Sequence, residues 1–329
     1  MSGRAHTTPH GGRPRRHALL AALAPFVLSL AVALGAGGCS QPSYDSRASQ
    51  DVAASDHGLL AATETVQFAR RAGPRPTGSW GDIEARAFVT LAFQQLGYPT
   101  RAQEFLVGDP GDHLLSANII ATKEGTSGTT LVVGAHYDTL PGSQGATDNA
   151  TGIGLLLEMA GRLREVETPS TIVFVAFGAH WQQAAGASFF IERLEDFERD
   201  ALLGMIDLDT VAGGAGLVAY GPEGDAAWMR SALAIAAERS DVTLTEAVAE
   251  AGGEHGAFAA AGIPYAGVVS ADDVVDGRVD AEQPTTVAGT PRDTVRRLLA
   301  GDTGLLERQL GDGARLLEEL LTSTLEPPT

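Results

Sequence analysis

An imidazole and two carboxylates follow one apolar segment of the sequence at short spacing. The run at residues 131–135 is followed by His136 and Asp138, and a Gly-rich loop then leads to Asp148, where an apolar helix begins. Histidine nitrogens and aspartate oxygens are common ligands of protein-bound zinc. Because a strand end and a helix start bring these groups to one place, the spacing predicts a metal site.

Two of these residues also have a purely structural interpretation. His136 could be a buried histidine with satisfied hydrogen bonds, and Asp148 could cap the helix that follows, since aspartate is a favoured N-cap residue. Capping and metal binding are compatible for Asp148. The position of His136 at a strand end, with both carboxylates close behind it, favours a metal ligand over a core histidine.

The elements that must position these groups alternate between strands and helices. Apolar runs predict strands at residues 116–121, 131–135, 171–177, 202–208, 216–220 and 265–270. Helical spacing of apolar residues predicts helices at residues 59–71, 83–96, 153–163, 187–194, 226–237, 291–300 and 305–321. Buried strands interleaved with helices indicate a sheet covered on both faces. We therefore predict an α/β protein, a three-layer α/β/α sandwich with a mixed, mostly parallel central sheet, in one domain over residues 58–322.

Several candidate ligands follow predicted strands directly. His136, His180 and Asp209 each lie at or just beyond a strand end. Ligand sites in such sheets gather at the carboxyl ends of strands, so we expect three strand ends to face one crevice. Asp207, two residues before Asp209, is an alternative for the same role.

From residue 73 to residue 294 the sequence resembles a known family. The matching motifs are Gly-Pro-Arg-Pro-Thr-Gly-Ser at residues 73–79, Ala-His-Tyr-Asp-Thr at 135–139 and Thr-Asp-Asn-Ala-Thr-Gly at 147–152. They are similar to motifs of the exported zinc aminopeptidases related to leucyl aminopeptidase and glutaminyl cyclase, which have the zinc-peptidase fold. That family typically binds two zinc ions bridged by one aspartate, with a neighbouring glutamate as general base for the attacking water.

The resemblance assigns roles to the residues around position 136. By motif, His136, Asp148 and Asp209 match the ligands of one zinc ion, and Asp148 matches the bridging aspartate. Asp138 matches the residue that orients the imidazole of His136. Three protein ligands and a water molecule would make an open metal site.

The residues expected at the second zinc site are missing. Where the family has Gly-Ala-Glu-Glu, this sequence has Gly-Ala-His-Trp, with His180 in place of the base and Trp181 in place of a ligand. No Asp or Glu occurs between Glu167 and Glu192, so we expect no substitute acid nearby. Gly289 precedes Thr-Pro-Arg-Asp-Thr where the family has histidine. The sequence therefore predicts at most one zinc ion.

The residues that replace the family pattern have two interpretations each. His180 could be a drifted residue, or a general base at a single-metal site, because histidine titrates near neutral pH. Trp181 could only pack, or could be a platform for the substrate. Residues 254–258 and 262–264 match a family segment that borders the substrate pocket. His255 is therefore a candidate pocket residue, the alternative being a surface histidine on a loop.

The N-terminal segment has the pattern of an export signal. Residues 4–16 contain four arginines, and an apolar run follows at residues 18–36. Small residues directly before Cys39 resemble a bacterial lipobox, so we predict a lipoprotein signal over residues 1–38 and a lipid on Cys39. A plain signal peptide and an uncleaved anchor helix are the alternatives. The protein would then be exported and held on the outer face of the cytoplasmic membrane or in the outer membrane.

The segments that flank the predicted domain are polar. Residues 39–57 are rich in Ser, Gln, Ala and Asp and predict a flexible tether, and residues 323–329 predict a disordered tail. The chain of 329 residues carries a formal net charge of −18. Such an acidic chain argues against nucleic acid as a partner. We expect membrane contact through the lipid on Cys39 and not through a basic surface.

Two functions are compatible with this site, because a fold alone does not fix a function. The one we favour is a non-catalytic or strongly impaired peptidase relative that binds a peptide or a small amine or amide. The alternative is a single-metal metallopeptidase or amidohydrolase with His136, Asp148 and Asp209 as ligands and His180 as base. Loss of a positioned general base costs a factor of about 10²–10⁴ in rate. A structural envelope component with a vestigial crevice is a third interpretation.

Overall fold

The computed structural model describes residues 55–327, except residues 110, 301 and 303. The predicted signal, Cys39 and residues 39–54 of the predicted tether lie outside this part of the chain. Where the described part begins, the carbonyl oxygen of Ser55 accepts a hydrogen bond from Arg162 at 2.9 Å, so the end of the predicted tether contacts the folded body. Among the described residues, no helix is long and apolar enough to span a bilayer.

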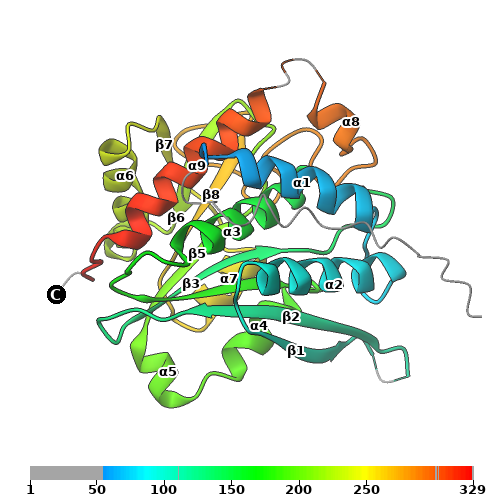
Figure 1. The fold of residues 1–329 in the computed structure, drawn as a ribbon, viewed down its shortest axis with the longest axis horizontal. Helices are drawn as coiled ribbons and strands as arrows, with labels where there is room; N and C mark the ends of the chain where they lie inside the picture. The colour runs from blue at the N-terminus through cyan, green and yellow to red at the C-terminus, as the bar shows by residue number, and fades with distance from the viewer. Residues whose placement is uncertain (1–54, 110, 301, 303, 328–329) are drawn as a thin grey trace, which may run out of the picture. The chain divides into compact units, whose positions relative to one another are not determined.

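Eight strands form one mixed sheet (Figure 1). They are β1 (Thr100–Val107), β2 (Leu114–Lys123), β3 (Thr130–His136), β4 (Thr171–Phe177), β5 (Leu202–Leu208), β6 (Gly216–Gly221), β7 (Leu244–Val248) and β8 (Tyr265–Ala271). Their order across the sheet is β1-β2-β4-β3-β5-β8-β6-β7. The central strands β4, β3, β5 and β8 are parallel, whereas β2 runs antiparallel to β4 and β6 antiparallel to β8. The edge strand β1 is antiparallel to β2, and β7 is parallel to β6.

Helices cover both faces of the sheet. The larger ones are α1 (Leu59–Ala72), α2 (Trp80–Gln95), α3 (Ala150–Leu163), α6 (Trp228–Arg239) and α9 (Leu305–Thr322). The shorter ones are α4 (Ala185–Glu192), α5 (Asp196–Ala201), the 3₁₀ helix η2 (Gly224–Ala227), α7 (Gly253–Ala260) and α8 (Val295–Leu298). Figure 1 shows α1, α3 and α9 above the sheet and α4 and α5 below it. The predicted three-layer α/β/α sandwich with a mixed sheet is confirmed.

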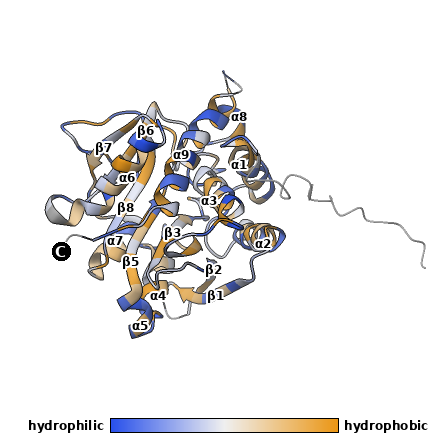
Figure 2. Ribbon diagram, turned by 60° about the vertical axis from the view of Figure 1, so that its left-hand side comes forward, coloured by the Kyte–Doolittle hydropathy of each residue, from blue (hydrophilic) through white to orange (hydrophobic). Residues whose placement is uncertain are grey.

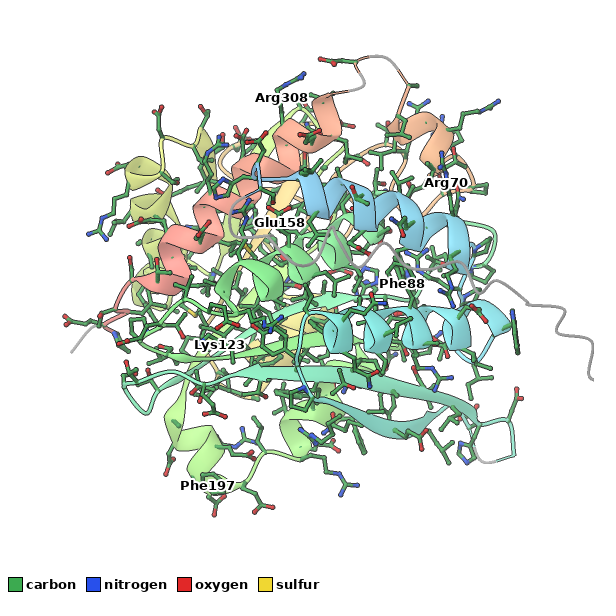
Figure 3. The ribbon with its side chains drawn as sticks, in the orientation of Figure 1. Arg70, Phe88, Lys123, Glu158, Phe197 and Arg308 are labelled. Carbon is green, nitrogen blue, oxygen red and sulfur yellow. The ribbon has the colours of Figure 1, made fainter. Side chains whose placement is uncertain are left out.

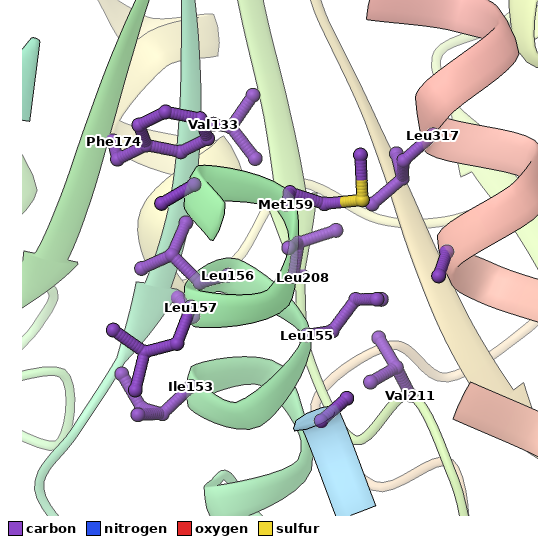
Figure 4. Close-up of a cluster of buried hydrophobic side chains, with 14 of the residues drawn as sticks. Val133, Ile153, Leu155, Leu156, Leu157, Met159, Phe174, Leu208, Val211 and Leu317 are labelled. Carbon is purple, nitrogen blue, oxygen red and sulfur yellow. The ribbon is translucent and has the colours of Figure 1, made fainter. Parts of the chain in front are cut away.

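The alternation of side chains along β3 explains why two cores form. Val133 packs into the cluster that contains α1, α3 and α9, whereas Val132 packs with Phe190 of α4 and Phe258 of α7 on the other face. Figure 4 shows Val133 in the larger cluster with Leu156 of α3. Because both faces of the central strands are buried, their sequences are continuous apolar runs. Figure 2 shows that the central strands are apolar. The outer helix α5, which has no buried residue, is polar.

A buried carboxylate of α3 holds the start of α1. Helix α1 has Gly58 at its N-cap, which offers no side chain to the free backbone N–H groups. Glu158 of α3 accepts from Gly58 N at 2.9 Å and from Ala61 N at 2.8 Å, and Arg162 lies 2.8 Å from the same carboxylate. Figure 3 places Glu158 between the two helices. This contact fixes α3, the helix whose start carries the candidate ligand Asp148.

The start of α3 is held by Asn149 and not by Asp148. Asn149 is the N-cap, and its Oδ1 accepts from Gly152 N at 2.9 Å. The same side chain also accepts from Thr210 N at 3.1 Å and donates to the Leu208 carbonyl at 2.7 Å. Asn149 therefore ties the start of α3 to the end of β5. The interpretation of Asp148 as a simple helix cap is wrong, and its carboxylate is free to face the strand ends.

Candidate metal centre

His136 ends β3 with its two ring nitrogens in different surroundings. Nδ1 lies 3.1 Å from the backbone carbonyl oxygen of Asp138, and Nε2 lies 3.1 Å from Asp148 Oδ1 and 3.6 Å from Asp209 Oδ1. A carbonyl oxygen only accepts hydrogen bonds, so Nδ1 carries a proton. The structure thus brings the three predicted ligands together, with Nε2 of the imidazole directed toward both carboxylates.

Two buried atoms of this cluster have no hydrogen bond of good geometry to any of the residues that the structure describes. Among the described residues, His136 Nε2 and Asp148 Oδ1 are buried side-chain atoms without a hydrogen bond of good geometry. Both residues are nearly inaccessible, at 1% and 3% exposure, so solvent does not satisfy them. Buried polar atoms are normally paired. Two orphaned atoms of ligand type that face each other fit a bound cation, and the nitrogen and oxygen donors suit zinc.

The charges of the cluster shift one another's pKa values when no cation is present. Burial opposes the charged form of His136, as does nearby His180, but the contacts with Asp148 and Asp209 outweigh both and raise the pKa of His136 to about 10. Burial, reinforced by the Asp148 charge, raises the pKa of Asp209 to about 6. For Asp148, the contact with His136 outweighs burial and lowers the pKa. A proton on His136 therefore takes the place that a cation would fill.

Asp138 was expected to orient the imidazole of His136 through its side chain, and the structure shows a different contact. Its contact with the His136 ring comes from its backbone carbonyl, since its carboxylate lies 3.9 Å from Nδ1. The carboxylate instead accepts the backbone N–H of His180 at 3.0 Å and of Trp181 at 3.5 Å, and the hydroxyl of Thr77 at 3.3 Å. Asp138 therefore positions both the imidazole of His136 and the loop that carries His180.

His180 enters the cluster from the end of β4. Its ring stacks on that of His136, with 4.0 Å between the ring centroids and 17° between their planes. Among the described residues, His136, His180 and Asp209 each place one possible ligand atom within 4.8 Å of those of the other two. Asp148 joins this group through its contact with His136 Nε2. The sequence suggested a base at position 180, and the structure places that residue among the candidate ligands.

Two glutamates that sequence reasoning missed hold His180. Glu254 Oε2 lies 2.6 Å from Nδ1, and Glu282 Oε2 lies 3.4 Å from Nε2. The expectation that no acid lies near this position was wrong. Burial opposes protonation of His180, but Glu254 and then Glu282 outweigh it and raise its pKa well above 6.5. The same ion pairs outweigh burial and lower the pKa of both Glu254 and Glu282.

Trp181 and Gly289, the residues that the resemblance aligns with two ligands of the family, lie near each other. A Cβ atom built on Gly289 would lie 3.3 Å from Asp148 Oδ2 and 3.5 Å from Cη2 of Trp181. Gly289 therefore lies close both to the second oxygen of Asp148 and to the indole of Trp181. An indole offers no lone pair to a metal ion, so these residues cannot hold a second ion.

His255 lies in the interior. It is 1% exposed, its Nδ1 lies 3.0 Å from Asp207 Oδ2, and Tyr220 donates its hydroxyl to the same oxygen at 2.9 Å. The surface alternative for His255 is wrong, and its side chain is engaged by a core carboxylate. Because Asp207 is committed to His255 and Tyr220, Asp209 is the β5 carboxylate that faces His136.

Two buried charged residues fix the loop between β3 and α3. The guanidinium of Arg75 donates to the carbonyl oxygens of Tyr137, Gln144 and Gly145. Burial outweighs the neighbouring carboxylates and lowers the pKa of Arg75 to about 10. Asp293 accepts the backbone N–H of Thr147 at 2.8 Å and of Asp148 at 3.0 Å. The loop that presents Asp148 is thus held at both ends by side chains from elsewhere in the chain.

An acid-lined cavity opens beside Glu282. Its volume is about 710 Å³, and its lining carries several carboxylates and one guanidinium, from Glu250, Asp272, Asp273, Asp280, Glu282 and Arg278. Since Glu282 also contacts His180, one wall of this cavity reaches the histidine cluster. A positively charged ligand would be favoured here by the excess of negative charge.

The structure is an α/β sandwich with a buried cluster of histidines and aspartates at its strand ends that could hold a metal ion. The profile of Peptidase family M28 matches residues 118–305, more than half of the chain. The chain belongs to this family.

Curated relatives share parts of the sequence. The chain is 29% identical over 177 residues to the alkaline phosphatase isozyme conversion protein of Escherichia coli K12, a match that covers 47% of this chain and 51% of that protein. It is 29% identical over 194 residues to the probable lipoprotein aminopeptidase LpqL of Mycobacterium tuberculosis H37Rv, covering 53% of this chain and 37% of that protein. The chain thus spans about half or less of the length of these relatives.

Solved structures share the fold over most of the chain. A zinc aminopeptidase from Bacillus subtilis matches with a TM-score of 0.68 at 17% identity, covering 82% of this chain and 96% of that one. A glutaminyl cyclase from an Acidobacteriales bacterium matches with a TM-score of 0.65 at 20% identity, covering 80% and 93%. The resemblance to zinc aminopeptidases and glutaminyl cyclases is confirmed at the level of family and fold.

Proposed function

We propose that this chain is an M28-family protein that holds a single zinc ion and binds a peptide or a small amine or amide without ordinary two-zinc hydrolysis. His136, Asp148 and Asp209 would hold the ion. When bound, zinc would place positive charge at the strand ends beside the ligand-binding crevice. The observation that carries the proposal is that Gly289 lies close to the indole of Trp181 and to the second oxygen of Asp148, where neither residue 181 nor residue 289 offers a metal ligand.

The surroundings of His180 argue against its action as a base. Both ring nitrogens face glutamate oxygens, at 2.6 Å from Glu254 and 3.4 Å from Glu282. Ionised carboxylates only accept hydrogen bonds, so in the metal-free protein both nitrogens would carry protons, and an ion on Nε2 would occupy that lone pair in the loaded protein. A doubly protonated imidazole has no lone pair with which to take a proton from water. The loss of a positioned base costs about 10²–10⁴ in rate, before the missing second ion is counted.

The acidic cavity supports a ligand with a free amine. Its carboxylates lie next to Glu282, which in turn contacts the histidine cluster. An ammonium group in the cavity would be attracted by this charge, and the attached carbonyl would lie toward the zinc ligands. A nucleic acid would be repelled by the same surface, in keeping with the net charge of −18.

Export with a lipid anchor on Cys39 is part of the proposal. It rests on the basic and apolar pattern of residues 1–38 and on the small residues before the cysteine. The name of the mycobacterial relative, a probable lipoprotein aminopeptidase, supports the same location. Metabolic labelling with a palmitate analogue should mark the wild-type protein and not the C39S variant. Equal labelling of both would remove the anchor from the proposal.

The central test compares binding with turnover. Zinc-loaded protein is titrated calorimetrically with a short peptide that has a free N-terminus and with its N-acetylated form, and both are incubated for mass-spectrometric detection of cleavage. We expect the free peptide to bind more tightly than the acetylated one and to remain uncleaved. The Glu282→Gln variant should weaken this binding, while Glu238→Gln, which changes an exposed glutamate of α6, should not. Cleavage at about 1–10³ s⁻¹, the range of ordinary enzymes, would refute the proposal.

One observation favours the single-metal hydrolase as a second candidate. Glu254 Oε1 is a buried carboxylate oxygen without a partner among the described residues, and the other oxygen of the same group holds His180. A carboxylate behind an imidazole is the arrangement of an oriented base. If this pair works as a base, His180→Gln and Glu254→Gln should both abolish slow peptide hydrolysis and leave peptide binding unchanged. Absence of any measurable hydrolysis in the wild type excludes this candidate.

A further inference from the structure

We propose that His180 is a fourth protein ligand of the retained metal ion, so that the site consists of His136, His180, Asp148 and Asp209. This inference rests on the single-metal site of the proposed function and goes beyond it. Neither the family pattern, which has glutamate as the base at this position, nor the sequence alone assigns a metal ligand to residue 180. The proposal replaces the role of His180 as a base by a role in binding the ion.

The geometry of the cluster is the first argument. Ligand-type atoms of His136, His180 and Asp209 lie within 4.8 Å of one another. The two imidazoles lie against each other, with 4.0 Å between their centroids and 17° between their planes. His180 is 5% exposed and its backbone N–H is fixed by Asp138 at 3.0 Å. The imidazole is therefore held at the cluster and is not directed toward solvent.

The partner of the other ring nitrogen is the second argument. A histidine that binds a metal through one nitrogen almost always donates its second N–H to a carboxylate or a backbone carbonyl. His180 has the buried carboxylate of Glu254 at 2.6 Å from Nδ1, and His136 has the carbonyl of Asp138 at 3.1 Å from Nδ1. In both imidazoles Nδ1 is thus held by a protein oxygen, which leaves Nε2 as the nitrogen that would bind the ion.

The contact of Nε2 with Glu282 does not oppose this role. Glu282 lies 3.4 Å from Nε2 and its side chain is 40% exposed, so it can turn toward solvent when an ion takes the Nε2 lone pair. Glu254 is 1% exposed and has no such freedom. Glu254 is therefore a fixed partner of Nδ1, whereas Glu282 is a partner that can move away from Nε2.

The charges and the number of ligands are also consistent. Two neutral imidazoles and the carboxylates of Asp148 and Asp209 carry two negative charges, which balance one divalent cation. Four protein ligands are typical of structural zinc sites, whereas catalytic sites keep one position open for water. A four-ligand site explains why a chain that keeps three family ligands has changed its base to histidine. The ion would then stabilise the strand ends that form the ligand-binding crevice.

Counting imidazoles around the ion tests the inference directly. Protein loaded with Zn²⁺ alone is measured by X-ray absorption spectroscopy, and Co²⁺-loaded protein by visible absorption. We expect two imidazoles per zinc ion in the wild type, with the intense cobalt bands of a tetrahedral site. The His180→Gln variant should show one imidazole and weaker cobalt bands. The control His113→Ala, which removes an exposed histidine between β1 and β2, should keep two imidazoles.

Affinity for zinc provides a second readout that does not depend on His180 itself. Glu254→Gln should weaken Zn²⁺ binding by about 10–100-fold, the usual effect of losing an outer partner of a ligating histidine, and the control Glu238→Gln, at an exposed glutamate of α6, should leave it unchanged. Circular dichroism of each variant verifies the fold. One imidazole per ion in the wild type, or unchanged zinc affinity in folded Glu254→Gln protein, would overturn the inference. A second zinc ion per chain would instead contradict the proposed function.

Discussion

Asp293 offers a sharp test of how the retained site is held together. Its two oxygens accept the backbone N–H groups of Thr147 and Asp148 at 2.8 and 3.0 Å, and it is 1% exposed. In the Asp293→Asn variant the amide oxygen can accept one of these N–H groups, while the NH₂ group faces the other. A hydrogen bond to a charged group contributes about 1.5–3 kcal/mol, so the variant should be less stable by about that amount.

The Asp293→Asn substitution should change two measurable quantities, the melting temperature and the affinity for zinc. For a domain of this size, about 2–4 °C of melting temperature correspond to 1 kcal/mol, so differential scanning fluorimetry of metal-free protein should show a decrease of about 3–12 °C. Zinc affinity, measured by competition with a chromophoric chelator, should fall by about 10–100-fold because the backbone of the ligand Asp148 is no longer fixed. The fall in affinity distinguishes a positioning role from a purely structural one.

A matched variant controls for the loss of an acidic side chain. Asp272 is exposed and accepts a single backbone N–H, from Thr286 at 3.1 Å. Asp272→Asn should change stability by no more than about 0.5 kcal/mol and leave zinc affinity unchanged. If Asp293→Asn loses stability but binds zinc as tightly as the wild type, the reasoning that Asp293 positions Asp148 is refuted.

Three further predictions concern the core, the start of α3 and the metal-free cluster. Leu156→Ala, at a fully buried position of α3, should cost about 2–5 kcal/mol in urea unfolding, and a loss below 1 kcal/mol would contradict the packing described. Asn149→Ala should cost about 1–2 kcal/mol as a lost cap and also lower zinc affinity, and an unchanged melting temperature would contradict it. Because the folded pKa of His136 is raised from 6.5 to about 10, chelator-treated protein should be fully stabilised by this group below about pH 6.5 and lose that stability as the pH rises through 10. An unfolding free energy of the chelator-treated protein that does not change between pH 7 and 10 would contradict this prediction.

The strands that could be predicted from the sequence are those that are buried on both faces of the sheet. The central strands are covered on both faces, so their residues form uninterrupted apolar runs that can be recognised without the structure. Strands β1 (Thr100–Val107) and β7 (Leu244–Val248) were not predicted, because as edge strands they carry polar and charged residues on exposed positions. The predicted helix at residues 291–300 is only the short α8, since Thr294 caps it and the preceding residues run as turns around Asp293.

The candidate site was predictable where its residues are close in sequence or carry a motif. His136, Asp148 and Asp209 come together because parallel strands end at one edge of the sheet. Glu254 lies 74 residues from His180 and is brought to it by α7, which packs under β5 and β8. No local pattern indicates such a contact, although the neighbouring His255 lies in a segment that already suggested the pocket. His255 itself is buried by Asp207 and Tyr220, an arrangement that only the fold determines.

The central claim is that Trp181 and Gly289 leave room for one metal ion in place of two. Elemental analysis by inductively coupled plasma mass spectrometry, on protein purified without chelator and dialysed against excess zinc, counts the ions directly. We predict close to one tightly held zinc ion per chain, lost in the Asp148→Asn variant and retained in the Asp272→Asn control. Two tightly held ions per chain would contradict the account.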